Sequence, residues 1–500
     1  MPLPEPRTPH PAPLFQTVIG LEVHVQLLTE TKLFCRCSAR FGGEPNTQTC
    51  PVCIGMPGAL PVMNRRAYEL ALKTAVALDC EIPPFTKWDR KQYYYPDLPK
   101  GYQISQYDLP MSQRGWLEIS DAKGGFEPKR IGITRAHLEE DAGKSMHDER
   151  AGVADSRIDL NRAGTPLLEI VSEPDMRSPA EARAYLDELK LLLTYLGVSD
   201  CNMQEGSLRV DANVNLHVET PDGTVATPIV EIKNMNSFRA VERALAYEAQ
   251  RQFDVWQQTG QKKGDVPKQT RGWDDAAEVT RGQRHKEESS DYRYFPDPDL
   301  APVTTTPERV TAVRASLGEL PAALRSRLER DYGLKPYDAG VLVNQGRAAA
   351  TYYLTLADAL GDPKLASNWM QQDVSRWLND HQTTIDAFPI EARRLAALLA
   401  KVKRGELETT RARDVFAAML DSPKPVDEVM SDLGIVAVDE SATVELCREL
   451  LAANPKIVAD VKNGNEKALG SLVGQAKKRN PNVHPGQVRE IAIKLIQEMP

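Results

Sequence analysis

The sequence predicts an α+β domain followed by two all-α domains. Around residues 18–27 and 208–218 apolar and polar side chains alternate, as they do along half-buried strands. Helical spacing occurs between and after these stretches, so strands and packing helices share one segment. Beyond about residue 302 the strand pattern ends, and helices punctuated by proline and glycine follow.

The first strand, VIGLEVHVQL, is predicted to have one apolar and one polar face, because successive side chains of a strand point to opposite sides. The apolar face would carry Ile19, Leu21, Val23, Val25 and Leu27, and the polar face Gly20, Glu22, His24 and Gln26. LRVDANVNLHV repeats the pattern at 208–218. A turn at 221–223 then leads into PIVEIKN, which predicts an antiparallel pair.

Two helices are predicted in the same segment. Ser178 and Glu181 form a capping box with Pro179 at the first helical position, and leucines at helical spacing follow. A second helix should run from about Ser237 to Gln258. We expect both to be structural.

Composition divides the chain into four parts. Residues 1–14 are rich in proline, which predicts a disordered lead-in and not a targeting peptide. Residues 15–295 form the mixed domain, 296–404 a helical domain and 405–500 a helical tail. Lys456 to Lys494 holds eight Lys or Arg and three Asp or Glu. This positive excess contrasts with a whole-chain net charge of −8, so nucleic acid would have to bind a local basic surface.

The seven cysteines are too sparse for a disulfide framework. Four of them form the pairs Cys35-x-Cys37 and Cys50-x-x-Cys53, twelve residues apart, which favours one structural Zn²⁺. A lost or partial metal site and a redox role are the alternatives. Four thiolates leave no open position, which argues against catalytic zinc. No apolar run of about eighteen residues occurs, so we expect a cytoplasmic protein without a membrane partner.

Acidic residues on or beside strand-like segments indicate a metal and nucleotide site. Glu22 and His24 are two residues apart on one strand, so their side chains leave the same face. Singly, such residues are more often solvated or locally hydrogen-bonded. Further acids in the same domain strengthen the Mg²⁺ hypothesis, namely Glu139, Glu140, Glu169 and Glu205.

Gly143-Lys144-Ser145 looks like the end of a phosphate-binding P-loop, but the first glycine of that motif is replaced by Leu138. The intervening residues are acidic and would repel a phosphate directly. Carboxylates can still meet a phosphate through Mg²⁺. The loop 87–108, with Lys91 and three consecutive tyrosines, is either a packed surface loop or a binding loop.

Several motifs together resemble the B-subunit family of tRNA-dependent aspartyl/glutamyl amidotransferases, the GatB/GatE family. They are IGLEVHVQL, CPVCIGMPGALPV, YYYPDLPKGYQISQYD, HLEEDAGKS, DLNRAGTPLLEIVSEPD, MQEGSLRVDANVN, EIKNMNSF and DYRYFPDPDL, in family order. The C-terminal region resembles the YqeY-like tail of the same family. Its GQAKKRNPNVHPGQV departs from the usual tail motif, so single tRNA contacts are not assigned from it. No long inserted domain occurs, which favours the B over the E subunit.

The resemblance implies a cradle-shaped domain that uses ATP and Mg²⁺ to phosphorylate the side-chain carboxyl of Glu-tRNA(Gln) or Asp-tRNA(Asn). Ammonia from a glutaminase A subunit would then give the amide, in a heterotrimer with a small C subunit. A non-discriminating aminoacyl-tRNA synthetase is a further possible partner. Which tRNA serves as substrate is left open.

Residue roles are implied by the same resemblance. The catalytic set would be Glu22, His24, Lys91, Glu139 and Glu140, and the ATP side would include Lys144, Glu169 and Glu205. Mg²⁺ would be held by Glu22, His24, Glu139 and Glu205. The tail cations Lys477, Lys478 and Arg479 would bind tRNA.

Two rival functions remain at this point. A zinc-stabilised tRNA-binding scaffold explains the cysteines and the basic tail but not the acids on polar strand faces. A free-standing ATP-dependent ligase of small carboxylates would accept free glutamate or aspartate. Of the cysteines outside the zinc set, only Cys201 adjoins a motif, so we expect a partner to release the ammonia.

Overall fold

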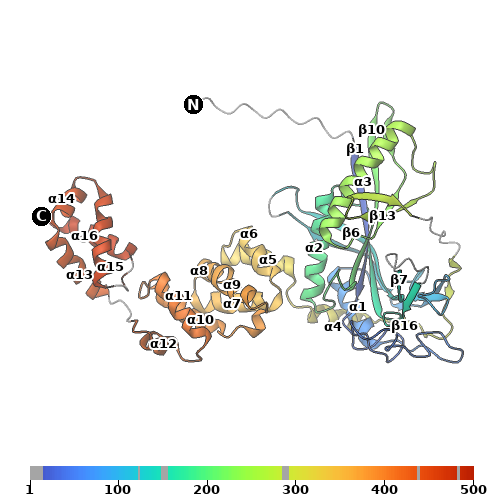
Figure 1. Ribbon diagram of the computed structural model, residues 1–500, viewed down its shortest axis with the longest axis horizontal. Helices are drawn as coiled ribbons and strands as arrows, with labels where there is room; N and C mark the ends of the chain where they lie inside the picture. The colour runs from blue at the N-terminus through green and yellow to red at the C-terminus, as the bar shows by residue number, and fades with distance from the viewer. Residues whose placement is uncertain are drawn as a thin grey trace. The chain divides into compact units, whose positions relative to one another are not determined.

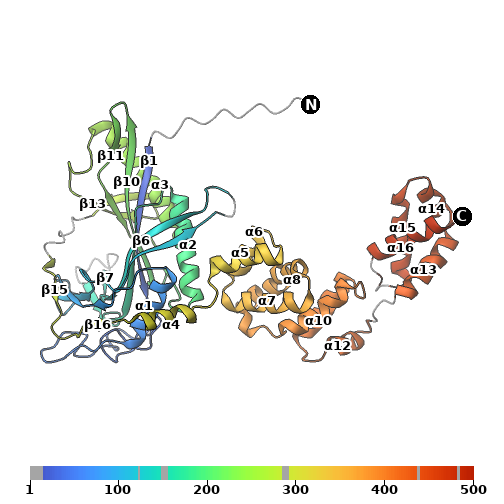
Figure 2. The same cartoon turned by 180° about the vertical axis from the view of Figure 1, so that it is seen from behind.

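The computed structural model describes residues 15–121, 124–147, 156–283, 292–435, 440–480, 483 and 485–499. The predicted lead-in at 1–14 lies outside the described residues. The chain divides into two compact units, with the boundary between Ala323 and Leu324. Figure 1 labels their elements, and Figure 2 shows them from behind. The first unit holds the sheets and the second is helical, which confirms the predicted change of class.

The first unit is built on a nine-stranded mixed sheet of order β14-β13-β12-β10-β1-β9-β6-β5, with β11 paired to β10. Neighbouring strands are antiparallel except for the parallel pair β12 and β13. The strands are β1 (Phe15–Gln26), β5 (Gln113–Ile119), β6 (Lys129–Glu140), β9 (Pro166–Ser172), β10 (Leu208–Thr220), β11 (Gly223–Ala226), β12 (Val230–Lys233), β13 (Gln269–Asp274) and β14 (Val279–Gly282).

β1 lies in the interior of the sheet between β10 and β9, and from Ile19 to Val25 one of its faces is apolar. Its predicted core residues Ile19, Leu21, Val23 and Val25 are fully buried. The strand pairs along almost its whole length with β10 and along its second half with β9. The predicted antiparallel pairing of PIVEIKN is confirmed, since β12 pairs with β10.

Three helices pack into the same core as β1: α1 (Arg65–Ala77), α2 (Pro179–Tyr195) and α3 (Phe238–Thr259). Figure 1 shows α2 and α3 beside the sheet, in contact with each other. Ser178 Oγ accepts a hydrogen bond from the Glu181 amide at 3.1 Å, as the capping box predicts. Ser237 Oγ accepts from the Ala240 amide at 3.0 Å, so both predicted helix starts are confirmed.

Three small sheets complete the first unit. They consist of β15 (Phe295–Pro296) with β3 (Asp89–Gln92) and β4 (Tyr102–Ser105), of β16 (Val303–Thr304) with β2 (Phe85–Thr86), and of β7 (Lys144–His147) with β8 (Ser156–Asp159). The helix α4 (Pro307–Ser316) packs on α1. The observed boundary therefore lies about 28 residues beyond the predicted one at 295/296, because β15, β16 and α4 pair or pack with the first unit.

The described part of the second unit contains helices and no strand. The helix α5 (Pro321–Tyr332) crosses the boundary, and the helices after it are α6 (Pro336–Asn344), α7 (Arg347–Leu360), α8 (Pro363–Trp369), α9 (Ser375–Asp380), α10 (Ala392–Lys403), α11 (Thr409–Leu420), α12 (Val426–Asp432), α13 (Glu440–Ala453), α14 (Pro455–Lys462), α15 (Leu469–Arg479) and α16 (Pro485–Glu498). A π-helical turn, η3 (Met370–Val374), joins α8 to α9. Short 3₁₀ turns are η4 (Ile385–Ala387) and η5 (Glu466–Ala468).

The predicted tail at 405–500 contains two packing groups. α11 and α12 pack on α10 and so continue the preceding helical segment. A separate apolar cluster is formed from α13, α15 and α16, with Leu450, Leu472 and Val488 fully buried. Among the described residues, no helix is both long enough and apolar enough to cross a membrane.

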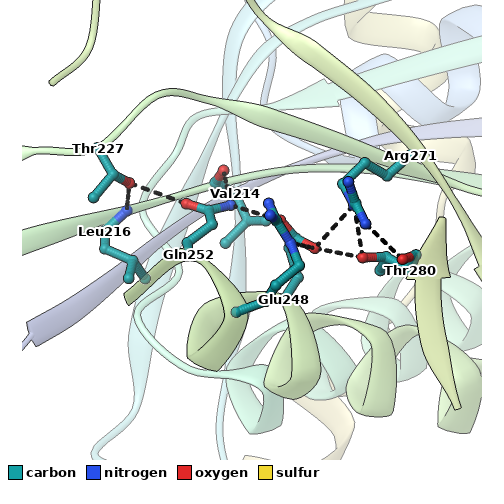
Figure 3. Close-up of polar contacts among 8 residues, drawn as sticks. Val214, Leu216, Thr227, Glu248, Gln252, Arg271 and Thr280 are labelled. Carbon is teal, nitrogen blue, oxygen red and sulfur yellow. Dashed lines mark hydrogen bonds and ion pairs between the residues drawn. The ribbon is translucent and has the colours of Figure 1, made fainter. Parts of the chain in front are cut away.

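A buried carboxylate joins α3 to the edge strands β13 and β14 (Figure 3). Glu248 has no exposed side-chain surface, and Thr280 Oγ1 donates to its Oε2 at 2.7 Å. Arg251 Nε donates to the same carboxylate at 3.0 Å, and Arg271 Nε lies 3.6 Å away. Arg271 also donates to the Thr280 carbonyl at 2.6 Å, so one carboxylate holds a helix and two strands together.

We expect Glu248→Ala to destabilise the first unit by about 2 kcal/mol, because it leaves buried donors unpaired. The value is below that of a fully buried ion pair because Arg251 and Arg271 keep 21% and 19% exposure and can turn toward water. The free energy of unfolding in urea measures it. Gln258→Ala, at an exposed position of the same helix, is the matched control. An equal effect of the two substitutions would contradict the assigned role.

Candidate functional site

The polar face of the central strands lines a cavity of about 1210 Å³. Its floor comprises Glu22 and His24 of β1, Arg135, His137 and Glu139 of β6, Glu169 of β9, Arg209 and Asp211 of β10, and Glu231 and Lys233 of β12. These residues share one face because they alternate with core residues along each strand. The chemistry-bearing groups therefore lie on rigid sheet positions.

One cluster of possible metal ligands lies where β1, β9 and β6 meet. His24 Nε2 is 3.6 Å from Glu139 Oε1 and 3.7 Å from Glu169 Oε2. One ligand atom from each of the three residues lies within 4.8 Å of the other two. His24 stands directly opposite Glu169 in the strand register. Two carboxylates and an imidazole at this spacing can hold a divalent cation.

His137 supports this cluster from β6. It is 3% exposed, stands opposite Glu169 in the register, and its Nε2 lies 3.4 Å from Glu169 Oε2. Its Nδ1 is buried without a hydrogen-bond partner among the described residues. A ring that points a nitrogen at a ligand carboxylate fixes the orientation of that carboxylate.

Burial controls the charge of this cluster. Burial, and after it the charge of Glu169, raises the pKa of Glu139 to about 7. Burial lowers the pKa of His137 to about 4. For Glu169 burial acts upward, but the imidazoles of His137 and His24 and the nearby Arg135 outweigh it and lower the pKa. Glu169 thus carries the stable negative charge, whereas Glu139 loses its proton readily when a cation binds.

A second acidic cluster lies across the same floor. Glu22, Asp211 and Glu231 bring one carboxylate oxygen each within 4.8 Å of one another. Glu22 and Asp211 are opposite each other in the register of β1 and β10. Lys233 donates to Asp211 and lies 3.1 Å from Glu231 Oε1, and Asn213 donates to Glu22 at 2.9 Å.

Basic and aromatic side chains complete the cavity. Lys91 of β3 projects its Nζ to 4.7 Å from the centre of the Tyr292 ring. Tyr107 and Tyr294 stack with ring centres 4.0 Å apart. The further cations of the lining are Arg135, Arg209, Lys233 and Lys268. The cavity therefore offers carboxylates for a cation and cations for the anion that such a metal would accompany.

Five of the predicted site residues line the cavity: Glu22, His24, Lys91, Glu139 and Glu169. Glu140 does not, although it follows Glu139 directly, because the next residue of a strand points to the other side. Its buried carboxylate accepts from the Ile104 amide at 2.8 Å and pairs with Lys100. Glu140 thus holds β6 to the segment around β4.

Glu205 and Lys144 lie away from the cavity lining. Glu205 is exposed in the turn before β10, where no strand pairing turns it toward the floor. Lys144 is exposed on β7, opposite Asp159 of β8. The Gly-Lys-Ser segment therefore begins a short strand and forms no phosphate loop. This agrees with the interpretation from Leu138, but it removes Lys144 from the group that the cavity brings together.

Several residues of the cavity were not predicted as site residues, although the alternation of polar and apolar residues could have identified some of them. Arg209 and Asp211 lie on the polar face of the predicted strand 208–218, by the same alternation that selected Glu22 and His24. Glu231 lies in the predicted strand PIVEIKN. His137 precedes the acidic pair, but nothing in a single sequence showed that it would face Glu169.

The four paired cysteines converge as predicted. Cys53 Sγ lies 3.6 Å from Cys35 Sγ, 3.7 Å from Cys50 Sγ and 3.9 Å from Cys37 Sγ. Tetrahedral thiolates at a Zn–S distance of about 2.3 Å would stand about 3.8 Å apart. Hydrogen bonding from Cys35, and the charge of the buried Lys32, lower the pKa of Cys53 to about 4 against the effect of burial. The donor set fits zinc.

Comparisons with known proteins agree with this architecture. A family model described as the GatB/GatE catalytic domain matches residues 17–311, and one described as a GatB domain matches residues 351–496. A protein of Rhodopirellula baltica is 61% identical over 97% of both chains. One from Moorella thermoacetica is 48% identical, covering 95% of this chain and 98% of its own. One from Carboxydothermus hydrogenoformans is 47% identical, covering 93% and 95%.

All three relatives are named as the B subunit of an aspartyl/glutamyl-tRNA(Asn/Gln) amidotransferase. The matched catalytic domain includes the residues of the cavity and of the cysteine cluster. The chain belongs to the GatB/GatE family, as a B subunit of the tRNA-dependent amidotransferases.

Proposed function

We propose that this chain phosphorylates the side-chain carboxyl of a glutamate or aspartate carried on tRNA, using ATP and Mg²⁺, and that ammonia then converts it to the amide. The observation that carries the proposal is the cavity itself, in which two carboxylate clusters face lysines and arginines on one sheet. Because this chemistry serves translation, the proposed location is the cytoplasm.

The chemistry requires both kinds of charge. A carboxylate becomes an acceptor for ammonia only after one of its oxygens is made a good leaving group, and phosphorylation does this. Transfer of a phosphoryl group to a carboxylate brings two anions together, so cations must neutralise the charge that develops. When bound, Mg²⁺ supplies part of that neutralisation.

The residues of the floor divide the work. His24, Glu139 and Glu169 are the proposed Mg²⁺ ligands. Glu22 lies two residues before His24 on β1, opposite Asp211. Lys91, on the Tyr292 side of the cavity, is the proposed phosphate contact. The lining cations can hold the remaining phosphate oxygens, and the stacked tyrosines form part of the cavity wall.

Two rival functions are less well supported. A scaffold without catalysis has no use for the two acidic clusters of the floor, and the matched family model is described as catalytic. A free-standing ligase would act on free glutamate or aspartate. Amide formation measured with each misacylated tRNA, and with the free amino acids, separates the substrates.

The nitrogen is proposed to come from a partner glutaminase subunit, in a complex that includes a small third subunit. Cys201, the one cysteine beside a motif outside the zinc set, is fully buried, and burial raises the pKa of its thiol to about 11. A nucleophilic cysteine needs the opposite, an accessible thiol with a lowered pKa. The relatives' names likewise describe one subunit of a larger enzyme.

We expect Glu139→Gln, His24→Ala and Glu22→Gln each to reduce tRNA-dependent ADP release by about a hundredfold or more, because each removes a polar group from the floor where metal and phosphate meet. The affinity for tRNA should change little. Glu205→Gln is the matched control, since it removes an exposed carboxylate that does not line the cavity. Near-normal ADP release from any of the three would remove that residue from the proposed site.

We expect one zinc per chain, and its loss in Cys50→Ser together with a lower stability of the first unit, because structural zinc contributes folding energy. Elemental analysis of protein purified under reducing conditions measures the first, and thermal unfolding the second. Cys80→Ser is the control. Cys80 is buried away from the four paired cysteines, so this substitution should leave the zinc content unchanged. Protein that folds normally without zinc would refute the assignment.

Ending the chain after Ile435 should weaken tRNA binding and flatten its salt dependence, because the removed segment carries the basic excess between Lys456 and Lys494. This end point spares α11 and α12, which pack on α10, whereas truncation at 405 would expose that packing. The proposed contacts Lys477, Lys478 and Arg479 lie in the last turn of α15, with Arg479 also 3.0 Å from Glu449. Unchanged affinity across a salt titration would exclude a tRNA role for the tail.

A further inference from the structure

A second hollow of about 550 Å³ opens on the first unit. Its walls come from α2, from the turn at 200–204 and from the first residues of α3. It is distinct from the metal and phosphate cavity in its lining, because no residue of either carboxylate cluster belongs to it.

Positive charge dominates this groove. Arg183 and Lys190 reach it from α2 and Arg239 from α3. Lys190 and Arg239 are exposed, while Arg183 is 38% exposed and also donates to Asp187 at 2.7 Å. The one acid of the lining is Asp200, which is already hydrogen-bonded to Ser207. The groove thus presents three cations against one engaged carboxylate.

The aromatic ring of Phe238 organises these cations. The Arg183 guanidinium lies 5.6 Å from the ring centre and the Lys190 ammonium 5.9 Å, so both α2 cations gather beside the first residue of α3. Phe238 itself is half-buried and packs against the main core. The positive groove is therefore held in place by the fold.

The groove and the catalytic cavity share one lining residue. Asn236 lines both hollows, at the point where β12 leads into α3. Lys233, only three residues earlier, contacts two acids of the cavity floor. A polyanion whose end occupied the cavity would pass Asn236 and meet the cations of the groove.

We propose that this groove binds the sugar-phosphate backbone of the single-stranded 3′ end of the substrate tRNA, next to the amino acid that it presents to the cavity. The inference rests on the proposed function, in which a carboxyl on the RNA end must reach the floor. A backbone that tracks a cationic groove is the usual way in which single strands are bound. An acidic protein segment has no comparable reason to end inside the cavity.

The test uses the assembled complex with Lys190→Glu/Arg239→Glu, and intact tRNA beside tRNA trimmed of its single-stranded 3′ end. In the wild type, trimming should weaken binding, and the variant should weaken binding of intact tRNA with a salt slope lower by roughly 1 to 2. Trimming should then cost the variant little more, because the contact is already lost.

The matched control is Arg65→Glu/Arg66→Glu, an equal charge reversal at exposed positions of α1 that line neither hollow. It should leave the effect of trimming at its wild-type value. Equal losses of affinity for intact and trimmed tRNA in the groove variant, or no loss at all, would overturn the proposal. Absence of ADP release from the wild type would instead overturn the proposed activity, and the binding cycle would still decide the groove.

Discussion

The arrangement of the site depends on the antiparallel register of β1 between β10 and β9. This register sets Glu22 against Asp211 and His24 against Glu169, while β9 sets Glu169 against His137 of β6. Two members of each acidic cluster are brought together by these pairings. A shift of one residue would exchange the faces of β1 and move Glu22 and His24 into the core. The four fully buried residues of the apolar face, from Ile19 to Val25, oppose any such shift.

Much of the fold could be predicted because local patterns and tertiary packing agree. The strand of alternating residues at 18–27, the caps at Ser178 and Ser237 and the paired cysteines all lie where their patterns placed them. The boundary of the first unit was harder to predict from the sequence. β15 and β16 are two-residue strands, and a pairing that short leaves no periodicity in the sequence.

The candidate site was partly predictable for the same reason. Alternation selects a face, so Glu22 and His24 could be placed on a polar face, and the family resemblance gave them and Glu139 a role. Alternation cannot tell which of two adjacent acids points inward, and Glu140 turned away to pair with Lys100. Nor does it act in turns, which is why Glu205 could not be placed.

The origin of the cavity residues separates what is rigid in this protein from what can vary. The ligand-like acids and imidazoles stand on paired strands, whereas Tyr107 and Tyr292 lie outside the named strands. Loops accept substitution more readily than paired strands do. Sequence divergence would therefore change the tyrosine-bearing loops at the edge of the cavity and leave the acids and imidazoles on the strands in place. The preference for a longer or a shorter acidic side chain can then change while the residues that activate the carboxyl stay the same.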